Sequence, residues 1–338
     1  MVRILTRRIR PAHCSVLLAV SALAAGALAV AAPTAAGAGG APAPGRAAAA
    51  ACTVLPANNI WNHRVDRLTV PASSAAIVAS IGLTGRLHPD FGSGLIDGAP
   101  FGFPITTVPV GQAGVPVSFD YAAESDPGPS PIPANARIEG GAGATGDRHL
   151  LIHQPSSCRL YELFDAHRLA NGRWHAGSGA VFDLRSNRLR PRGWTSADAA
   201  GLPILPGLVR YDEVAGGAIR HAIRVTVPRS RNAYLWPARH RASTLTSSSL
   251  PPMGLRLRMK ASVSLVGLPA QSRVIAQAMQ SYGLIVADNG SPWFISGTQD
   301  SRWRNDDLNV LKRFTGTSFE VVDESALMIS VDSGAARP

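Results

Sequence analysis

The sequence predicts a β-rich α+β fold, an antiparallel β-sandwich of jelly-roll type with a few peripheral helices. The 338-residue chain carries 33 glycines and 26 prolines, residues that interrupt helices and mark turns. Short apolar runs lie between these turn residues, as in sandwiches and barrels. Because neither an internal repeat nor a second linker is present, we expect a single domain at residues 52–325, followed by a disordered tail at 326–338.

Helical spacing of apolar residues is confined to a few segments. Residues 73–81 are rich in alanine with flanking serines, and residues 306–313 form a second short helical pattern. The clearest pattern is at 271–282, where apolar residues share one face and Gly283 is a natural C-terminal stop. We therefore expect three helices.

The remaining apolar runs predict strands. In chain order we expect them at residues 105–110, 115–121, 149–153, 159–164, 174–184, 217–227, 233–237, 255–266, 284–287, 293–296 and 319–322. The turn at 111–114 predicts a hairpin between the first two strands. The sequence Asp288-Asn289-Gly290 predicts another hairpin, between strands 284–287 and 293–296.

The N-terminal residues predict export. Four arginines precede an apolar run that ends in small residues at Ala29 to Ala31, so residues 1–31 are typical of a secretory signal peptide cleaved near Ala31. The apolar run is too short for stable membrane insertion. The pair Arg7-Arg8 also permits twin-arginine export, although general secretion is preferred. Residues 32–51 are rich in Ala, Gly and Pro and predict a flexible tether.

Charge and cysteine content agree with an extracellular protein. Loss of four arginines and no acid on cleavage lowers the formal charge from +11 to +7, which favours anionic partners such as cell-wall glycans. The basic residues are scattered rather than grouped with aromatics, so we expect no nucleic-acid partner. Cys52 and Cys158 remain after cleavage and predict a disulfide. Closing a loop of about 107 residues constrains the unfolded chain by roughly 4–5 kcal/mol.

One candidate acid/base cluster follows from a predicted hairpin. If residues 154–157 form its loop, His149 lies directly opposite Glu162, with Cβ atoms about 5 Å apart. Asp147 shares the face of His149, because side chains alternate along a strand. These three residues are candidate catalytic groups beside a glycine-rich loop at 140–146. The alternative is a surface salt bridge on the solvent face of the hairpin.

A second cluster lies on the predicted strand 219–227. His221 shares a face with branched aliphatic residues, and Arg224 lies on the other face. The alternatives for His221 are a catalytic group and a core residue with satisfied hydrogen bonds. The carboxylates of Asp212 and Glu213 precede this strand; a turn or helix-capping role is the simpler interpretation for them.

The run WPARH supplies a third group, Trp236, Arg239 and His240. These residue types suit sugar stacking and carboxylate binding; the alternative is an ordinary strand end with a stacked arginine. The nucleophile elbow, zinc-protease helix, P-loop, dinucleotide fingerprint and EF-hand patterns are absent from the sequence. We expect no cofactor. We also expect no metal, because His149, His221 and His240 lack a local ligand spacing.

Several motifs resemble a family of secreted soil-bacterial proteins. They are GDRHLLI from Gly146, GWTSADAAGLPILPGLVRYDEV from Gly193, IRHAIRVTV from Ile219, PPMGLRLRMKAS from Pro251 and YGLIVADNGSPWFISG from Tyr282. The resemblance covers most of the mature chain and implies export, but it brings no activity and no catalytic residue. The paired-carboxylate strand motif of sandwich glycosidases and the R-x-E-x-R strand of jelly-roll alginate lyases are both missing.

These observations favour a secreted carbohydrate-active protein, a polysaccharide hydrolase or lyase acting on an acidic glycan. The expected proton-transfer groups are His149, Glu162, Asp147 and His221. The expected substrate-binding groups are Arg224, Arg239, Trp236 and His240. The alternatives are a non-catalytic glycan-binding module with an aromatic platform at Trp174, Trp194 and Trp236, or a structural exported protein. The sequence does not predict the oligomeric state.

Overall fold

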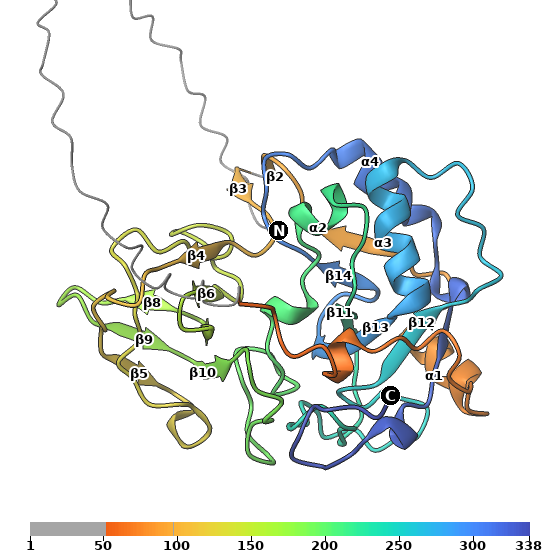
Figure 1. The fold of residues 1–338 in the computed structure, drawn as a ribbon, viewed down its shortest axis with the longest axis horizontal. Coiled ribbons are helices and arrows are strands. Elements are labelled where there is room, and N and C mark those ends of the chain that lie inside the picture. Colours follow the sequence, from red (N-terminus) through yellow and green to blue (C-terminus); the bar gives the residue numbers. More distant parts are fainter. Residues whose placement is uncertain (1–51, 97) are drawn as a thin grey trace, which may run out of the picture. The chain divides into compact units, whose positions relative to one another are not determined.

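The computed structural model describes residues 52–96 and 98–338, which belong to one compact unit (Figure 1). The predicted signal peptide at 1–31 and the tether at 32–51 lie outside the described residues. Within the described part, strands outnumber helices and form both mixed and antiparallel sheets, which confirms the β-rich α+β class.

The helices are short and few. They are α1 (Ser74–Ile81), α2 (Tyr211–Ala215), α3 (Ala270–Ser281) and α4 (Asn305–Asn309), with 3-10 turns at Ile60–Asn62, Ala122–Glu124, Leu205–Gly207, Val310–Arg313, Gly316–Ser318 and Ser325–Leu327. Helices α1 and α3 form where the alanine-rich segment and the helical apolar spacing predict them. The third predicted helix forms as α4 and the 3-10 turn after it.

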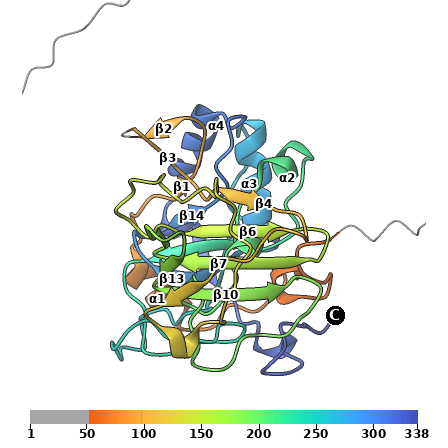
Figure 2. The same ribbon diagram turned by 90° about the vertical axis from the view of Figure 1, so that its left-hand side faces the viewer.

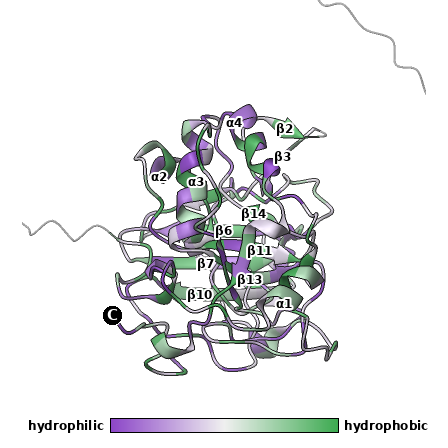
Figure 3. Cartoon of the chain, turned by 90° about the vertical axis from the view of Figure 1, so that its right-hand side faces the viewer, coloured by the Kyte–Doolittle hydropathy of each residue, from purple (hydrophilic) through white to green (hydrophobic). Residues whose placement is uncertain are grey.

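A six-stranded mixed sheet has the order β1-β14-β11-β13-β12-β15. Its strands are β1 (His88–Asp90), β14 (Phe294–Ser296), β11 (Ile223–Val227), β13 (Leu284–Asn289), β12 (Arg256–Met259) and β15 (Phe319–Val321). Strand β11 runs parallel to β13 and antiparallel to β14. Helix α3 packs against this sheet through the buried residues Ile275 and Met279 and has a polar outer face (Figures 1 and 3). Because the sheet contains parallel pairs, the antiparallel jelly-roll arrangement is not confirmed.

The rest of the fold contains three smaller sheets, built from strands between residues 95 and 183. One has the order β10-β7-β6-β4, one the order β5-β9-β8, and β2 and β3 form a small pair. Their strands are β2 (Leu95–Ile96), β3 (Ala99–Pro100), β4 (Ile105–Thr107), β5 (Val117–Phe119), β6 (Leu150–Gln154), β7 (Arg159–Phe164), β8 (His167–Arg168), β9 (Trp174–Ala176) and β10 (Ser178–Asp183). Figure 2 shows β6, β7 and β10 side by side.

The four-stranded sheet separates two hydrophobic cores. Leu151 and Leu160 belong to the large core that also contains the six-stranded sheet. Leu150 and Ile152 point to the opposite face and belong to a smaller core with Trp174, because side chains alternate along β6. The face of β7 and β10 that is turned toward the large core contributes Glu162, Phe164 and Ser178 to the site described below.

Two predicted hairpins do not form. Strand β11 lies between β13 and β14, so the segments on either side of Asp288-Asn289-Gly290 are not neighbours. The first predicted pair is also separated, because β4 pairs with β6 and β5 pairs with β9. Residues 233–237 contribute only an isolated bridge, Tyr234 to Met253. In both predicted hairpins a long-range strand pairing takes the place of the local one.

The C-terminal residues 326–338 are packed against the domain, so the predicted disordered tail is wrong. The Trp236 indole donates to the carbonyl of Ser333 at 2.8 Å, and the amide of Ala336 donates to Asn58 at 2.8 Å. The buried Arg239 guanidinium donates to Val331 and Asp332. The Trp236 and Arg239 side chains and the backbone of Asn58 thus bond to polar groups of the tail, which holds the tail in place.

The Cys52–Cys158 disulfide is confirmed, with Cα atoms 5.5 Å apart. It joins the first described residue to the turn between β6 and β7. Among the described residues, no helix is both long enough and apolar enough to cross a bilayer.

Candidate functional site

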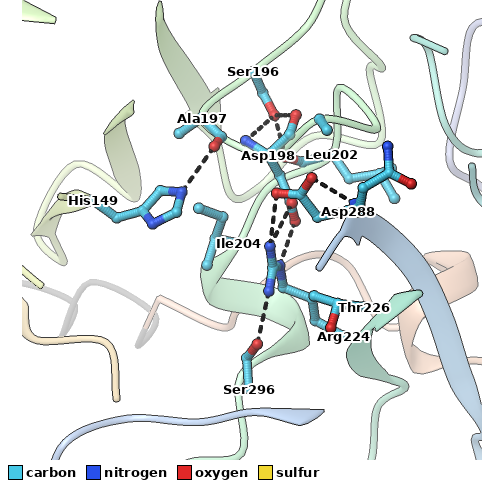
Figure 4. A network of polar contacts seen from close by, with 12 residues as sticks. His149, Ser196, Ala197, Asp198, Leu202, Ile204, Arg224, Thr226, Asp288 and Ser296 are labelled. Carbon is cyan, nitrogen blue, oxygen red and sulfur yellow. Dashed lines mark hydrogen bonds and ion pairs between the residues drawn. The ribbon is translucent and has the colours of Figure 1, made fainter. Parts of the chain in front are cut away.

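A buried ion-pair network lies between the two large sheets (Figure 4). The Arg224 guanidinium on β11 donates to both carboxylate oxygens of Asp198, at 2.7 and 2.8 Å, and to Ser296 Oγ at 2.8 Å. Arg224 is 5% exposed and Asp198 is 1% exposed. Two parallel charge-assisted bonds fix both the position and the orientation of the pair.

The loop that carries Asp198 is held by its neighbours. Ser196 Oγ accepts from the amide of Asp198 at 2.9 Å and donates to the carbonyl of Leu202 at 2.6 Å. The Ser178 hydroxyl donates to the Ser196 carbonyl at 2.6 Å. His149 Nε2 donates to the carbonyl of Ala197 at 3.0 Å. Ser196, the serine of the segment TSADAAGLP, and Ser178 on β10 therefore shape the loop and are not free nucleophiles.

His149 is a positioning residue that does not face solvent. It is 2% exposed, and its Nδ1 lies 2.5 Å from Glu139 Oε2. Both ring nitrogens face acceptors, so both carry a proton. Burial opposes this charge, but the Glu139 carboxylate outweighs burial and raises the pKa of His149 to about 9. The ring therefore acts as a fixed cation that holds the 196–198 loop.

Glu162 is not the direct partner of His149. The turn occupies residues 155–158, one position later than predicted, so Leu151 lies opposite Glu162. His149 remains on the same face but is displaced by two residues. Glu162 is fully buried, and its carboxyl group accepts from the amides of Ile204 and Leu205 at 2.8 and 2.9 Å. Burial raises its pKa to about 7, while these amides act in the opposite direction. Its role is to anchor the 3-10 turn at Leu205–Gly207.

His221 is a core residue with both nitrogens satisfied. It precedes β11 and is 4% exposed; Nδ1 lies 2.7 Å from the Ala222 carbonyl and Nε2 lies 3.1 Å from Glu213 Oε2. Glu213 lies inside α2, which has no side-chain cap, and its carboxylate also pairs with Arg210, so the predicted turn or helix-capping role is not the one observed for Glu213. Arg239 is likewise buried, with Nε donating to the Arg190 carbonyl at 2.6 Å. Neither side chain lines either of the two pockets described below.

A pocket of about 330 Å³ opens beside the network; we call it the acidic pocket. Among the described residues that line it, three carry carboxyl groups and none is Arg or Lys. They are Tyr121, Glu124, Asp147, Phe164, Ser178, Thr195, Ser196, Ala197, Ala199, His240, Asp288 and Asn289. Asp147 and His240 are the only members of the predicted site that line it.

Asp288 connects the network to the acidic pocket. It extends β13, and its carboxyl group accepts from Arg224 Nη2 at 3.2 Å. Burial raises the pKa of Asp288 to about 7, and repulsion from Asp198 adds to the rise. Arg224 opposes it only in part, because its two shorter bonds go to Asp198. With 21% of its side chain exposed, Asp288 presents a carboxyl group that releases its proton at about pH 7, well above the usual range of an aspartate.

His240 has a fixed ring orientation in the same pocket. Its Nδ1 lies 2.9 Å from the Ala199 carbonyl, which can only accept. In the neutral ring the proton is therefore on Nδ1, and the Nε2 lone pair is free. Nε2 lies 3.9 Å from Glu124 Oε2. Asp147 is exposed, so the pocket combines a carboxyl group of raised pKa, further carboxyl groups and an imidazole.

Sequence reasoning missed Asp288 and Glu124. The sequence Asp288-Asn289-Gly290 predicts a hairpin turn, although an acidic residue directly after the apolar run Leu284–Ala287 can also mark a strand that continues into a site. Glu124 lies in a 3-10 turn with no chemical pattern around it. The predicted aromatic platform does not form, because Trp174 is buried in the smaller core and Trp236 bonds to the tail.

No protein-family model matches this chain, and the comparisons with curated proteins and with solved structures found no similar protein.

Proposed function

We propose that this protein is an exported glycan hydrolase that cleaves glycosidic bonds in the acidic pocket. The observation that carries the proposal is Asp288, a carboxyl group with a pKa near 7 that reaches a pocket lined by a second aspartate and an imidazole. Glycosidases need one carboxyl group that keeps its proton until it reaches the leaving oxygen. Burial beside Asp198 provides this condition.

In this mechanism Asp288 donates its proton to the glycosidic oxygen as the bond to the sugar breaks. Asp147, on the rim of the same pocket, supplies the second carboxyl group, which activates the attacking water or forms the glycosyl intermediate. The Nε2 lone pair of His240 accepts a hydrogen bond from a sugar hydroxyl. Phe164 offers an apolar surface for a sugar ring.

The lining favours hydrolysis over elimination. A uronate lyase needs a cation to neutralise the substrate carboxylate, and the described lining of the acidic pocket holds neither Arg nor Lys. Arg224 and Arg239, the predicted clamp, are buried and bonded. We therefore infer that the bond cleaved lies between neutral or amino sugars. The disulfide supports the export that the N-terminal sequence predicts.

The test is reducing-end release from a panel of neutral glycans, with purified wild type, Asp288→Asn and the matched control Asp306→Asn. Asp306 is exposed and lies outside the acidic pocket. We expect Asp288→Asn to lower kcat by about 10²–10⁴, the usual contribution of a general acid, with little change in Tm. Asp306→Asn should match wild type. Absence of wild-type turnover on every glycan, or full activity of Asp288→Asn, would refute the proposal.

A further inference from the structure

A second pocket, of about 460 Å³, is lined by residues that lie a few positions along the chain from those of the acidic pocket. Three separate segments line both. Glu124 lines the acidic pocket and Asp126 the second one; on β10 Ser178 lines the first and Phe182 the second. The chain from Arg190 to Gly201 also passes from one to the other. Along β10 the step from Ser178 to Phe182 spans about 13 Å, a distance that a chain of a few sugars covers.

The second pocket differs in charge, and we call it the arginine pocket. Three arginines (Arg159, Arg188 and Arg190) and two aspartates (Asp126 and Asp183) line it. The Arg190 guanidinium is occupied by bonds within the protein. It is 4% exposed, pairs with Asp126, and donates to the carbonyls of Thr195 at 2.7 Å and Glu124 at 2.8 Å.

The other two arginines are available. Arg188 is exposed, and its side chain has no acidic partner among residues 52–96 and 98–338. Arg159 is 44% exposed and lies 3.7 Å from Asp183, beyond hydrogen-bond distance. The guanidinium groups of Arg159 and Arg188 are thus positioned at the pocket without a strong internal ion pair. Such a group binds a ligand carboxylate through two parallel N–H donors.

Aromatic side chains give this pocket a surface for a sugar ring. Phe182 and Trp194 are both half-buried and line it. The guanidinium carbon of Arg190 lies 5.5 Å from the centroid of Trp194 and 5.9 Å from that of Phe182, which holds the rings in place. A half-buried indole presents an apolar face on which a pyranose ring packs.

We propose that the arginine pocket binds an acidic sugar of the same glycan whose neutral linkage is cleaved in the acidic pocket. The inference about cleavage rests on the proposed function; the binding itself does not. Arg159 and Arg188 would contact the sugar carboxylate, and Trp194 would pack against the ring. The arginine pocket would then prefer an acidic sugar, and the acidic pocket a neutral one. A glycan that contains both kinds of sugar would bind with each sugar in its own pocket.

The test measures binding by titration calorimetry with trigalacturonate and a hyaluronan tetrasaccharide, and with maltotriose as the neutral reference. The proteins are wild type, Arg188→Gln, Arg159→Gln, the exposed control Arg220→Gln and the cleavage-deficient Asp288→Asn. We expect wild type and Asp288→Asn to bind at least one acidic probe equally well. Each pocket variant should bind it about tenfold more weakly, as for loss of a charge-assisted bond, with unchanged Tm. Arg220→Gln should match wild type.

Binding should also weaken as NaCl rises from 50 to about 500 mM, because salt screens the ion pair. Failure of both acidic probes to bind at millimolar concentration would overturn the proposal, as would equal affinity of Arg188→Gln, Arg159→Gln and wild type. Intact binding without any glycan turnover would instead refute the proposed hydrolysis and leave the acidic-sugar site standing. The two proposals therefore fail separately.

Discussion

Two arginines in the same six-stranded sheet are buried beside carboxyl groups, but their surroundings differ. Arg224 on β11 makes two short bonds to Asp198 and a third to Ser296. Arg256 on β12 lies 3.5 Å from Glu324 and donates only through Nη2, to the carbonyls of Ile60 at 2.8 Å and His63 at 3.4 Å. Within the described part of the chain, its Nε and Nη1 and both Glu324 oxygens have no hydrogen-bond partner.

This difference decides which pair stays charged. Burial disfavours both guanidinium charges, but Asp198 and Asp288 more than compensate and raise the pKa of Arg224. For Arg256 burial dominates and lowers the pKa, and burial raises the pKa of Glu324 to about 7. A buried ion pair repays its desolvation only with good geometry and additional hydrogen bonds. The Arg224–Asp198 pair therefore stays charged within the candidate site. The Arg256–Glu324 pair changes its charge with pH and contributes less to stability.

The largest effect on stability should come from breaking the better pair. Asp198→Asn leaves the buried Arg224 with Asp288, at 3.2 Å, as its one carboxylate partner beside the Ser296 hydroxyl. We therefore expect unfolding to become easier by about 3–5 kcal/mol, measured by urea denaturation. The variant should also lower the pKa of Asp288, because a repelling carboxylate is lost and Arg224 becomes available. The alkaline limb of glycan turnover, expected near pH 7 in wild type, should then shift to lower pH. An unchanged urea midpoint and pH profile would contradict the role assigned to this network.

The next effect concerns stability against pH. Asp288, Glu162 and Glu324 have pKa values raised by burial to about 7, so the folded state holds their protons above the pH at which the unfolded chain releases them. Stability should therefore fall as pH rises from about 4.5 to about 7. The raised pKa of His149 adds stability that is lost as pH rises from about 6.5 through 9. We expect a higher Tm at pH 5 than at pH 9; the reverse order would contradict these assignments.

The smallest effect should come from Glu324→Gln. An amide has nearly the same shape and cannot ionise, so this change should be close to neutral at pH 5 and stabilising by about 1 kcal/mol at pH 8. It should also reduce the slope of stability between pH 4.5 and 7. Urea denaturation at both pH values measures this, with Glu320→Gln as the control. Glu320 accepts from Arg258 at 2.8 Å, so its loss should not stabilise the protein at either pH.

The sequence predicts local features well and long-range pairings poorly. Helix α3 and the β6–β7 pair follow from apolar spacing within a short window, and the disulfide follows from having only two cysteines after export. The insertion of β11 between β13 and β14 depends on chain segments about 60 residues apart, which no local pattern records. For that reason the local pattern predicts a turn at Asp288, although it does mark the neighbouring Arg224 as a candidate site residue.

A difference of one residue in the position of the turn after β6 changes which side chains face each other at the site. The turn after β6 begins at Pro155 instead of Gln154, which moves Glu162 from His149 to Leu151. A shift of two residues preserves the face of each side chain but changes every direct partner. The types of residue in the site were thus predictable, whereas their pairings depend on the tertiary structure.

The packing of the C-terminal segment bears on the order in which the protein is assembled during synthesis. Gly334 accepts from Ile60 at 2.8 Å, and Ala336 donates to Asn58 at 2.8 Å. The buried guanidinium of Arg239 has its outward donors on Val331 and Asp332. These bonds close only when the last-made part of the described chain has left the ribosome. Until then Arg239 and residues 58–60 lack these hydrogen-bond partners. The native state is therefore reached after translation of the described residues is complete.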